Sequence, residues 1–167
     1  RICIFVYNRY INKLHVMILF FTILITTVLM EGVAWGMHKY LMHGFFWNLH
    51  EDHHLRTNHD SFFERNDTFF IFFSILSIAA FLIWKFTDSS IFLGIGIGIC
   101  IYGFIYFVIH DLFIHQRIKI WRNTQNPYLK AIRRAHKMHH KHLGKEEGEC
   151  FGMLWVPFKY YQAEFKG

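Results

Sequence analysis

The chain has 167 residues, enough for one domain, and 53% of them are hydrophobic, with 20 phenylalanines. The formal net charge of +6 fits either nucleic-acid binding or basic loops beside a membrane. No nucleic-acid-binding motif accompanies it, and the apolar residues stand in long runs, so we favour the membrane interpretation. The three cysteines, Cys3, Cys100 and Cys150, lack metal or redox spacing and predict no disulfide framework.

Three apolar runs are long enough to cross a bilayer as helices. The first covers residues 16–37, is interrupted by Glu31, and would be roughly 33 Å long at 1.5 Å per residue. The second covers residues 69–86 and the third residues 91–109. The four polar residues at 87–90 predict a tight turn between them, and therefore an antiparallel helical hairpin.

The chain before the first run differs from the rest. Residues 2–11 form a stretch too short and too polar to span a membrane. Met17 stands at the start of the first long apolar run, so we interpret residues 1–16 as an upstream extension. The expected organisation is a single membrane-embedded domain covering residues 1–167.

Two short patterns mark helix contacts and helix starts. Gly94 and Gly98, in the third run, have the G-x-x-x-G spacing that lets helices approach closely in lipid. Asn66-Asp67 precedes the second run and predicts a helix cap. The glycines therefore support helices that pack against one another inside the membrane, and the cap supports a helix start just before the second run.

A further helix is predicted after the third run. Asn126 and Pro127 have the residue types of an N-cap and a first helical position. The helix would continue to about Leu143, with Gly144 ending it. Its apolar stripe and basic residues predict an amphipathic helix lying under the membrane surface. Residues 145–167 predict no particular structure.

The lysines and arginines divide unevenly between the two faces of the membrane. Three spans place residues 39–65 and everything after residue 109 on one face, and the N-terminus and the 87–90 turn on the other. The first face holds 14 of the 18 lysines and arginines, so the positive-inside rule places it in the cytoplasm. Every histidine except His15 lies on or beside that face. We therefore expect an all-α integral membrane protein with three membrane-spanning helices, a fourth left open, and cytoplasmic-side helices that carry the histidines.

Histidine is the unusual residue of this composition, with 13 copies, and ten of them form four boxes. The pattern H-x4-H followed by H-x2-H-H occurs twice, once on each side of the predicted hairpin. Positions i, i+3 and i+4 share a helix face, so each H-x2-H-H box is expected to aim three imidazoles at one point. The two members of an H-x4-H box are about 140° apart on an ideal α-helix, and would flank such a cluster or serve two metals. The box residues are His38, His43, His50, His53, His54, His110, His115, His136, His139 and His140.

Two modules of five imidazoles predict a site for two metal ions. Imidazole suits zinc, copper, iron and nickel, so the boxes alone leave the metal open. The three histidines outside the boxes, His15, His59 and His142, are expected to be solvated.

Two carboxylates are candidates for tuning the metals. Asp111 adjoins His110 and would either orient another ligand imidazole or remain a hydrated acid at the membrane edge. Glu31 lies inside the first span, where an ionisable group is costly and usually functional. It stands seven residues before His38, and would bond a ligand histidine, relay protons, or bind a neighbouring helix as a neutral acid.

The boxes, together with His110-Asp111 and Asn66-Asp67, resemble the β-carotene hydroxylases of carotenoid-making bacteria and plants. Those enzymes belong with the membrane fatty-acid hydroxylase and desaturase-like di-iron enzymes. The resemblance covers residues 17–157, and its other stretches are Met30-Glu31, His38-Lys39-Tyr40-Leu41-Met42-His43-Gly44 and Phe151-Gly152. The chain departs from the family at Pro157-Phe158, where a double proline is frequent, and in the residues before Met17, which have no counterpart.

The resemblance implies a non-haem di-iron centre that uses O2 and a separate electron donor, such as ferredoxin with its reductase. One oxygen atom enters a C–H bond and the other becomes water. The implied substrate is β-carotene, hydroxylated at C3 of each ring to give β-cryptoxanthin and then zeaxanthin, in the inner (cytoplasmic) membrane of a bacterium. Zinc would be an inactive substitute, because it has no redox chemistry.

Two alternatives stay open. The first is a hydroxylase or desaturase of another lipid, an acyl chain or a sterol, whose histidine boxes would look similar. The second is a non-enzymatic membrane metal carrier. A carrier needs polar groups along a path across the bilayer, and the crowding of the histidines at one edge argues against it.

Overall fold

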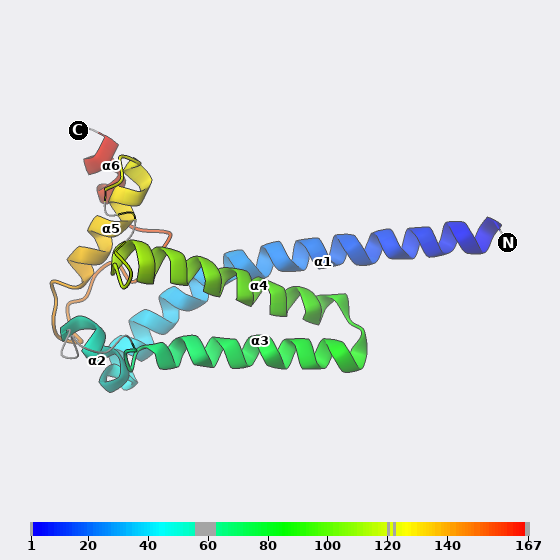
Figure 1. Ribbon diagram of the computed structural model, residues 1–167, viewed down its shortest axis with the longest axis horizontal. Coiled ribbons are helices and arrows are strands. Elements are labelled where there is room, and N and C mark those ends of the chain that lie inside the picture. Colours follow the sequence, from blue (N-terminus) through cyan, green and yellow to red (C-terminus); the bar gives the residue numbers. More distant parts are fainter. Residues whose placement is uncertain (1, 56–62, 120, 122, 166–167) are drawn as a thin grey trace. The chain divides into compact units, whose positions relative to one another are not determined.

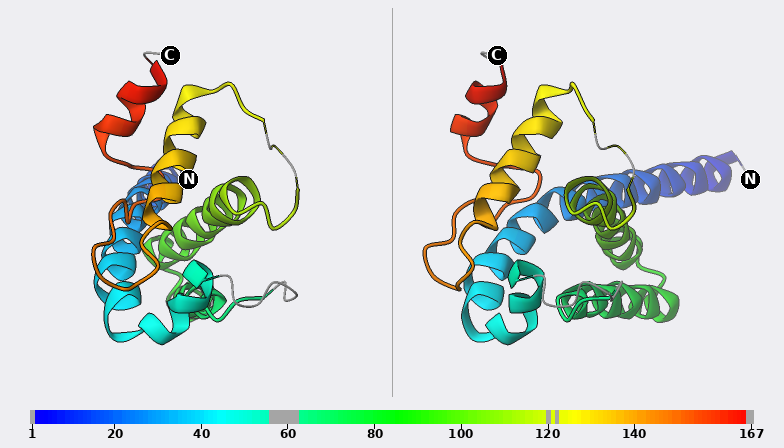
Figure 2. Two further views of the ribbon diagram at one scale, coloured as in Figure 1. Left: turned by 90° about the vertical axis from the view of Figure 1, so that its left-hand side faces the viewer. Right: turned by 60° about the vertical axis from the view of Figure 1, so that its left-hand side comes forward.

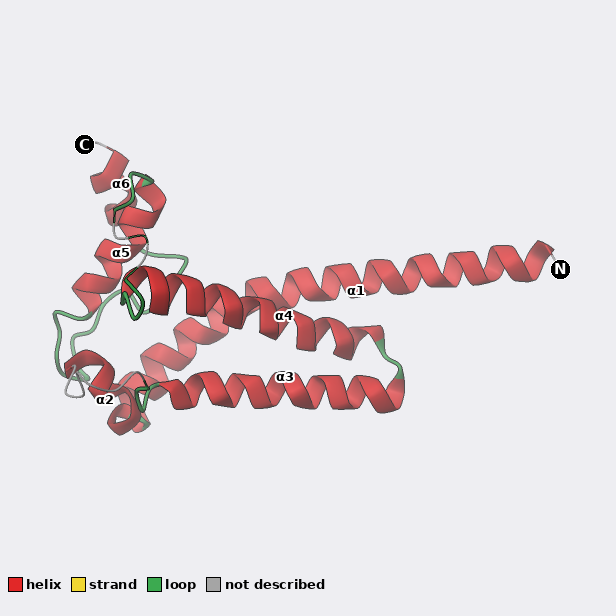
Figure 3. Cartoon of the chain, viewed as in Figure 1, coloured by secondary structure: helices red, strands yellow, loops and turns green. Residues whose placement is uncertain are grey.

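The computed structural model describes residues 2–55, 63–119, 121 and 123–165, and all of its regular structure is helical (Figure 3). The chain divides into two compact units. The first unit consists of Arg1–Met30 and Ile71–Gly103, and the second of Glu31–Phe70 and Phe104–Gly167. The elements in chain order are α1 (Ile2–Gly36), the π-helix η1 (Met37–Phe45), α2 (Trp47–Leu55), α3 (Asp67–Thr87), α4 (Ser90–Tyr106), the π-helix η2 (Phe107–Ile114), α5 (Pro127–His139) and α6 (Phe158–Phe165).

Three helical stretches of the described chain are long and apolar enough to cross a membrane, as predicted: Asn12–Phe45, Asp67–Thr87 and Ser90–Ile114. Large apolar side chains are exposed along them, such as Val28 and Ile75, which is the pattern of a surface that faces lipid. The first and third stretches are longer than the apolar runs, because the backbone remains helical through η1 and η2 where histidines interrupt the hydropathy. α1 also begins at Ile2, so the predicted upstream extension continues the same helix.

Within the first unit, α3 and α4 form the predicted antiparallel hairpin (Figure 1). The predicted G-x-x-x-G contact is confirmed by the space around the two glycines. A Cβ atom added to Gly94 would lie 2.7 Å from the Cβ of Thr22, and one added to Gly98 would lie 2.6 Å from that of Thr26. These distances are too short for two carbon atoms, so α4 can lie this close to α1 only with glycine at both positions.

In the second unit, α5 begins as predicted but ends earlier. The side chain of Asn126 accepts a backbone N–H bond at 3.1 Å, and a proline is the first helical residue. The helix ends at His139 and not near Leu143. After His139 the chain turns, so that the carbonyl of His142 faces α2 and accepts a hydrogen bond from a histidine there.

The apolar face of α5 forms the core of the second unit. Ala131, Ile132 and Ala135 are completely buried, and Phe113 of η2 and Tyr160 of α6 belong to the same cluster. Figure 2 shows α5 and α6 side by side. Protein therefore covers Ile132 and part of Leu129 on the apolar stripe of this helix, whereas Leu143 is exposed. The sequence did not predict α6.

Candidate metal centre

The two H-x4-H boxes lie in π-helices, where an N–H bonds to the carbonyl five residues earlier. The N–H of His115, for example, bonds to the carbonyl of His110 at 2.9 Å. A π-helix has more residues per turn than an α-helix, which brings residues five positions apart nearer to one side, and the rings of His38 and His43 are 5.2 Å apart. Those of His110 and His115 are 4.5 Å apart. The prediction that the two members of such a box lie about 140° apart is wrong, because it assumed the 3.6 residues per turn of an α-helix.

Each H-x2-H-H box divides its imidazoles between two groups of candidate ligands. In α2, His50 and His54 contribute to the first group and His53 to the second. The expectation that a box aims three imidazoles at one point is therefore wrong, because positions i+3 and i+4 are about 100° apart around the helix axis. The first group consists of His38, His43, His50, His54 and His139, and the second of His53, His115, His136 and His140.

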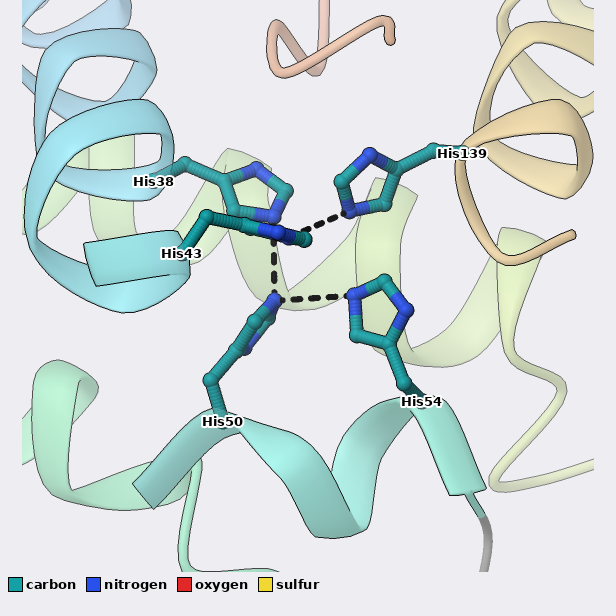
Figure 4. A group of neighbouring side chains, drawn as sticks. All are labelled: His38, His43, His50, His54 and His139. Atoms are coloured by element: carbon teal, nitrogen blue, oxygen red, sulfur yellow. Dashed lines mark hydrogen bonds between the residues drawn. The ribbon is translucent and has the colours of Figure 1, made fainter. Parts of the chain in front are cut away.

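The first group gathers imidazoles from η1, α2 and the C-terminal end of α5 (Figure 4). Its five candidate ligand atoms all lie within 4.8 Å of one another. The Nε2 atom of His50 is 3.1 Å from that of His38 and 3.2 Å from that of His54. The Nε2 atoms of His43 and His139 are 3.2 Å apart. One small ion could contact all five nitrogens.

Hydrogen bonds at the other ring nitrogen fix how these imidazoles are protonated. His50 donates its Nδ1–H to the side-chain oxygen of Asn66 at 2.7 Å. In the other four rings, Nδ1–H donates to a backbone carbonyl, which can only accept. The pairs are His38 with Phe151, His43 with Lys145, His54 with His142 and His139 with Glu149. A neutral imidazole that donates at Nδ1 carries a lone pair at Nε2, so the five Nε2 atoms present lone pairs to one another and a metal ion would satisfy them.

Burial keeps the rings of α2 and α5 in this neutral form. Desolvation lowers the pKa of His50 and of His139 to about 2, and that of His54 to about 4. Neighbouring imidazoles lower these pKa values further, because two positive charges so close would repel each other. The form present at neutral pH is therefore the form that binds a metal.

The second group also brings Nε2 atoms close together. The Nε2 atom of His136 is 2.7 Å from that of His115 and 2.9 Å from that of His140. The Nε2 atom of His53 is buried and has no hydrogen-bond partner among the described residues. A buried nitrogen without a partner is costly unless something else binds it, and a metal ion is the simplest candidate among four imidazoles.

His110, the tenth box residue, lies beside the second group. Its ring is 4.5 Å from that of His115 and 4.9 Å from that of His53, and Tyr106 stacks on it at 4.5 Å. Its Nδ1–H donates to the carboxylate of Asp111 at 2.8 Å. Asp111 is buried and accepts a hydrogen bond from the adjacent His110. This contact favours a role in orienting an imidazole, here that of His110, over that of a hydrated acid.

Two charged residues at this site were not singled out from the sequence. Glu64 accepts the Nδ1–H of His53 at 2.7 Å. Arg117 pairs with Glu64 at 3.2 Å and with Asp67 at 2.7 Å, and its Nε lies 3.7 Å from Asp111. The available signal was the polar run at residues 64–67, directly before a membrane span.

Glu31 holds a loop near the first group. Its Oε1 atom accepts backbone N–H bonds of 2.8–3.0 Å from residues 153–155. The preceding part of this loop supplies the carbonyls that accept from His38, His43 and His139. These three bonds link Glu31 to the first group through the backbone of this loop.

The histidines outside the boxes belong to neither group among the described residues. His15 is exposed, and its Nδ1 atom lies 3.2 Å from the hydroxyl of Ser90. His142 is half-buried and contributes its backbone carbonyl. His59 lies outside the described residues. Cys100 and Cys150 are free thiols.

Comparison with known proteins agrees with this geometry. Residues 23–158 match the model of the fatty acid hydroxylase family. The chain is 34% identical to a beta-carotene hydroxylase of Pseudescherichia vulneris over 139 residues, which are 80% of this chain and 74% of the relative. It is 37% identical to a beta-carotene hydroxylase of Pantoea ananas over 135 residues, 81% of this chain and 75% of the relative. No solved structure matches the chain. The chain therefore belongs to the fatty acid hydroxylase family, as a helical membrane hydroxylase with bacterial β-carotene hydroxylase homologues.

Proposed function

We propose that this chain hydroxylates the β-ionone rings of carotenoids with O2, converting β-carotene to β-cryptoxanthin and then to zeaxanthin. The observation that carries the proposal is the convergence of nine box histidines into two groups, with a tenth beside them. The names of the relatives, matched over most of the chain, support the carotenoid substrate. The proposal takes residues 1–167 as one hydroxylase domain.

The ten box histidines would hold two iron ions. Imidazole nitrogen suits iron and also zinc, but only a redox-active metal can take part in the oxidation of an unactivated C–H bond. Iron, when bound, supplies the activation of O2 that no side chain of this site can supply. Zinc in the same place would leave the protein folded and inactive.

The residues of the chain orient and shield this centre. The Nδ1–H bonds hold the rings so that Nε2 is presented to the metal. α2 carries ligands of both groups on one short helix, so the spacing between the groups is fixed by helix geometry. The rings of Trp47 and Phe151 pack against the imidazoles of the first group, with ring centroids 5.1–6.0 Å apart, and would limit the access of water there.

The substrate and the electrons would arrive by different routes. β-Carotene dissolves in the hydrocarbon of a membrane, and the three apolar helices support a site that takes it from the bilayer. The uneven division of lysine and arginine supports a cytoplasmic position for the histidines in a bacterial inner membrane. A soluble donor such as ferredoxin, with its reductase, would reach them there.

Expression in cells that accumulate β-carotene tests the proposal. Pigment chromatography should show zeaxanthin, with β-cryptoxanthin as the intermediate, and no change with an empty vector. Unchanged β-carotene together with altered fatty acids or sterols would assign the chain to another lipid. Unchanged pigments and lipids in iron-replete cells would contradict a hydroxylase of either kind.

A further inference from the structure

The second histidine group has a charged acceptor for one of its Nδ1–H bonds, whereas the first group has none. All five acceptors of the first group are neutral: four backbone carbonyls and the amide oxygen of Asn66. In the second group, His53 donates to the carboxylate of Glu64 at 2.7 Å. The adjacent His110 donates to the carboxylate of Asp111 at 2.8 Å.

The charged side chains beside the second group carry a net negative charge. Glu64, Asp67 and Asp111 all lie within 3.7 Å of one guanidinium, that of Arg117. Three carboxylates around a single cation leave an excess of negative charge. The side chains of Arg117 and Asp111 are only 11% exposed, so water screens that charge weakly.

A carboxylate behind an imidazole changes the imidazole as a ligand. It draws the Nδ1 proton toward itself, which makes Nε2 a stronger donor to a metal. It also places negative charge near the metal, which favours the ferric over the ferrous state. A neutral carbonyl or amide at the same position also orients the ring. It strengthens Nε2 as a donor less, and it stabilises the ferric state less.

We propose that Glu64 is a positioning residue that makes the two metal sites unequal, giving the second group tighter metal binding and a lower reduction potential than the first. The inference rests on the proposed function only in taking iron as the metal. It extends that function by assigning the more readily oxidised iron to the site that contains His53.

The chain offers a reciprocal pair of substitutions to test this. Glu64 and Asn66 stand two positions apart on one segment and serve His53 and His50 of the same short helix. Glu64→Gln keeps an accepting oxygen behind His53 and removes the charge. Asn66→Asp keeps an accepting oxygen behind His50 and adds a charge. Each variant therefore makes one group resemble the other.

The experiment is an anaerobic titration of the metal-free protein with ferrous iron against a competing chelator. The parent protein should show two different dissociation constants. Glu64→Gln should weaken the tighter site by about 10- to 100-fold and leave the other unchanged. Asn66→Asp should tighten the weaker site. Spectroelectrochemistry of the two-iron protein should show that Glu64→Gln raises the lower of the two reduction potentials.

Equal constants in the parent protein would overturn the inference, and so would a Glu64→Gln variant that weakens both sites equally. If that variant fails to fold, the Asn66→Asp variant provides the test. Unchanged iron affinity of the weaker site in Asn66→Asp would contradict the role of the carboxylate charge. Pigment chromatography separates the two proposals. If the two sites bind iron unequally but β-carotene is not converted, only the proposed substrate is wrong. If β-carotene is converted but the two sites bind iron equally, only the inference about Glu64 is wrong.

Discussion

His43 and His139 are 96 residues apart in the sequence, and their Nε2 atoms are 3.2 Å apart. Neither neutral ring can donate at this atom, because each gives its Nδ1–H to a carbonyl of the same loop, at 3.1 and 2.8 Å. Two lone pairs at this distance repel each other, whereas a cation between them would bind both. The pair thus indicates a metal site in a way that either histidine alone could not.

The first prediction follows from this pair. His139→Ala should abolish conversion of β-carotene, because it removes one of five imidazoles from the first group and leaves a gap in a buried metal shell. Pigment chromatography of cells expressing the variant measures the effect, and metal analysis of the purified variant should show iron lost from one site.

His142→Ala is the matched control, since this histidine is three residues away and belongs to neither group. Its contribution to the site is a backbone carbonyl, which alanine retains. The control should keep most of the activity. Equal activity in both variants would contradict the assignment of His139 as a ligand.

The second prediction concerns the loop held by Glu31. Glu31→Leu leaves three backbone N–H groups without their charged acceptor. A hydrogen bond to a charged group contributes about 1.5–3 kcal/mol, so we expect a loss of about 3 kcal/mol or more in the free energy of unfolding. Thermal unfolding in detergent measures this loss. Iron should leave the first group most readily, because the same loop orients three of its ligands.

Two further variants test whether the effect of Glu31→Leu arises from this loop. Glu146→Gln alters an exposed acid of the same loop and should change stability by less than about 0.5 kcal/mol. Gly152→Ala should resemble Glu31→Leu, because the added Cβ would overlap the carbonyl oxygen of Trp155. A stable Gly152→Ala variant with full iron content would contradict the importance of this loop.

The third prediction is the pH dependence of the metal-free protein. The pKa of His54 is lowered to about 4 and those of His50 and His139 to about 2, from an ordinary value of 6.5. Below pH 6.5 the unfolded chain therefore takes up protons that the folded chain does not, and acid favours unfolding. The free energy of unfolding should be highest above pH 6.5 and should fall as the pH is lowered toward 4. Denaturant midpoints measured between pH 8 and 5 test this, and a constant midpoint would contradict the buried neutral imidazoles.

Hydropathy and spacing predicted much of the fold and all nine histidines that form the two groups among the described residues. The three spans follow from uninterrupted apolar runs, and the hairpin from the polar turn between two of them. The ten box histidines stand out because a repeated pattern of imidazoles is rare. These features depend on residue type and local order, which a sequence records directly.

The division of the ligands could not be predicted in the same way. His53 and His54 are adjacent but serve different groups, which depends on where each side of α2 points in the folded chain. The π-helical turns that align His38 with His43 have no simple sequence pattern. The carbonyls that accept from four of the rings belong to the backbone, so their residue identities carry no signal. Glu64 was missed because only the fold brings it to His53.

The fourth prediction concerns topology. In a cysteine-free background, Ser89→Cys should react with a membrane-impermeant maleimide in intact cells. Lys39→Cys and Glu146→Cys should react only after the cells are permeabilised, because basic segments stay in the cytoplasm. Labelling of Lys39→Cys and Glu146→Cys from opposite sides would contradict three spans.

Iron content of the active protein tests the central claim most directly. The purified chain is stripped of metal, reconstituted anaerobically with ferrous iron, freed of excess, and assayed for iron and protein. Two separate groups of imidazoles predict two iron ions per chain, and a zinc-loaded sample that is folded but inactive. Full hydroxylase activity at one iron per chain, or with zinc alone, would contradict a two-iron centre built from the ten histidines.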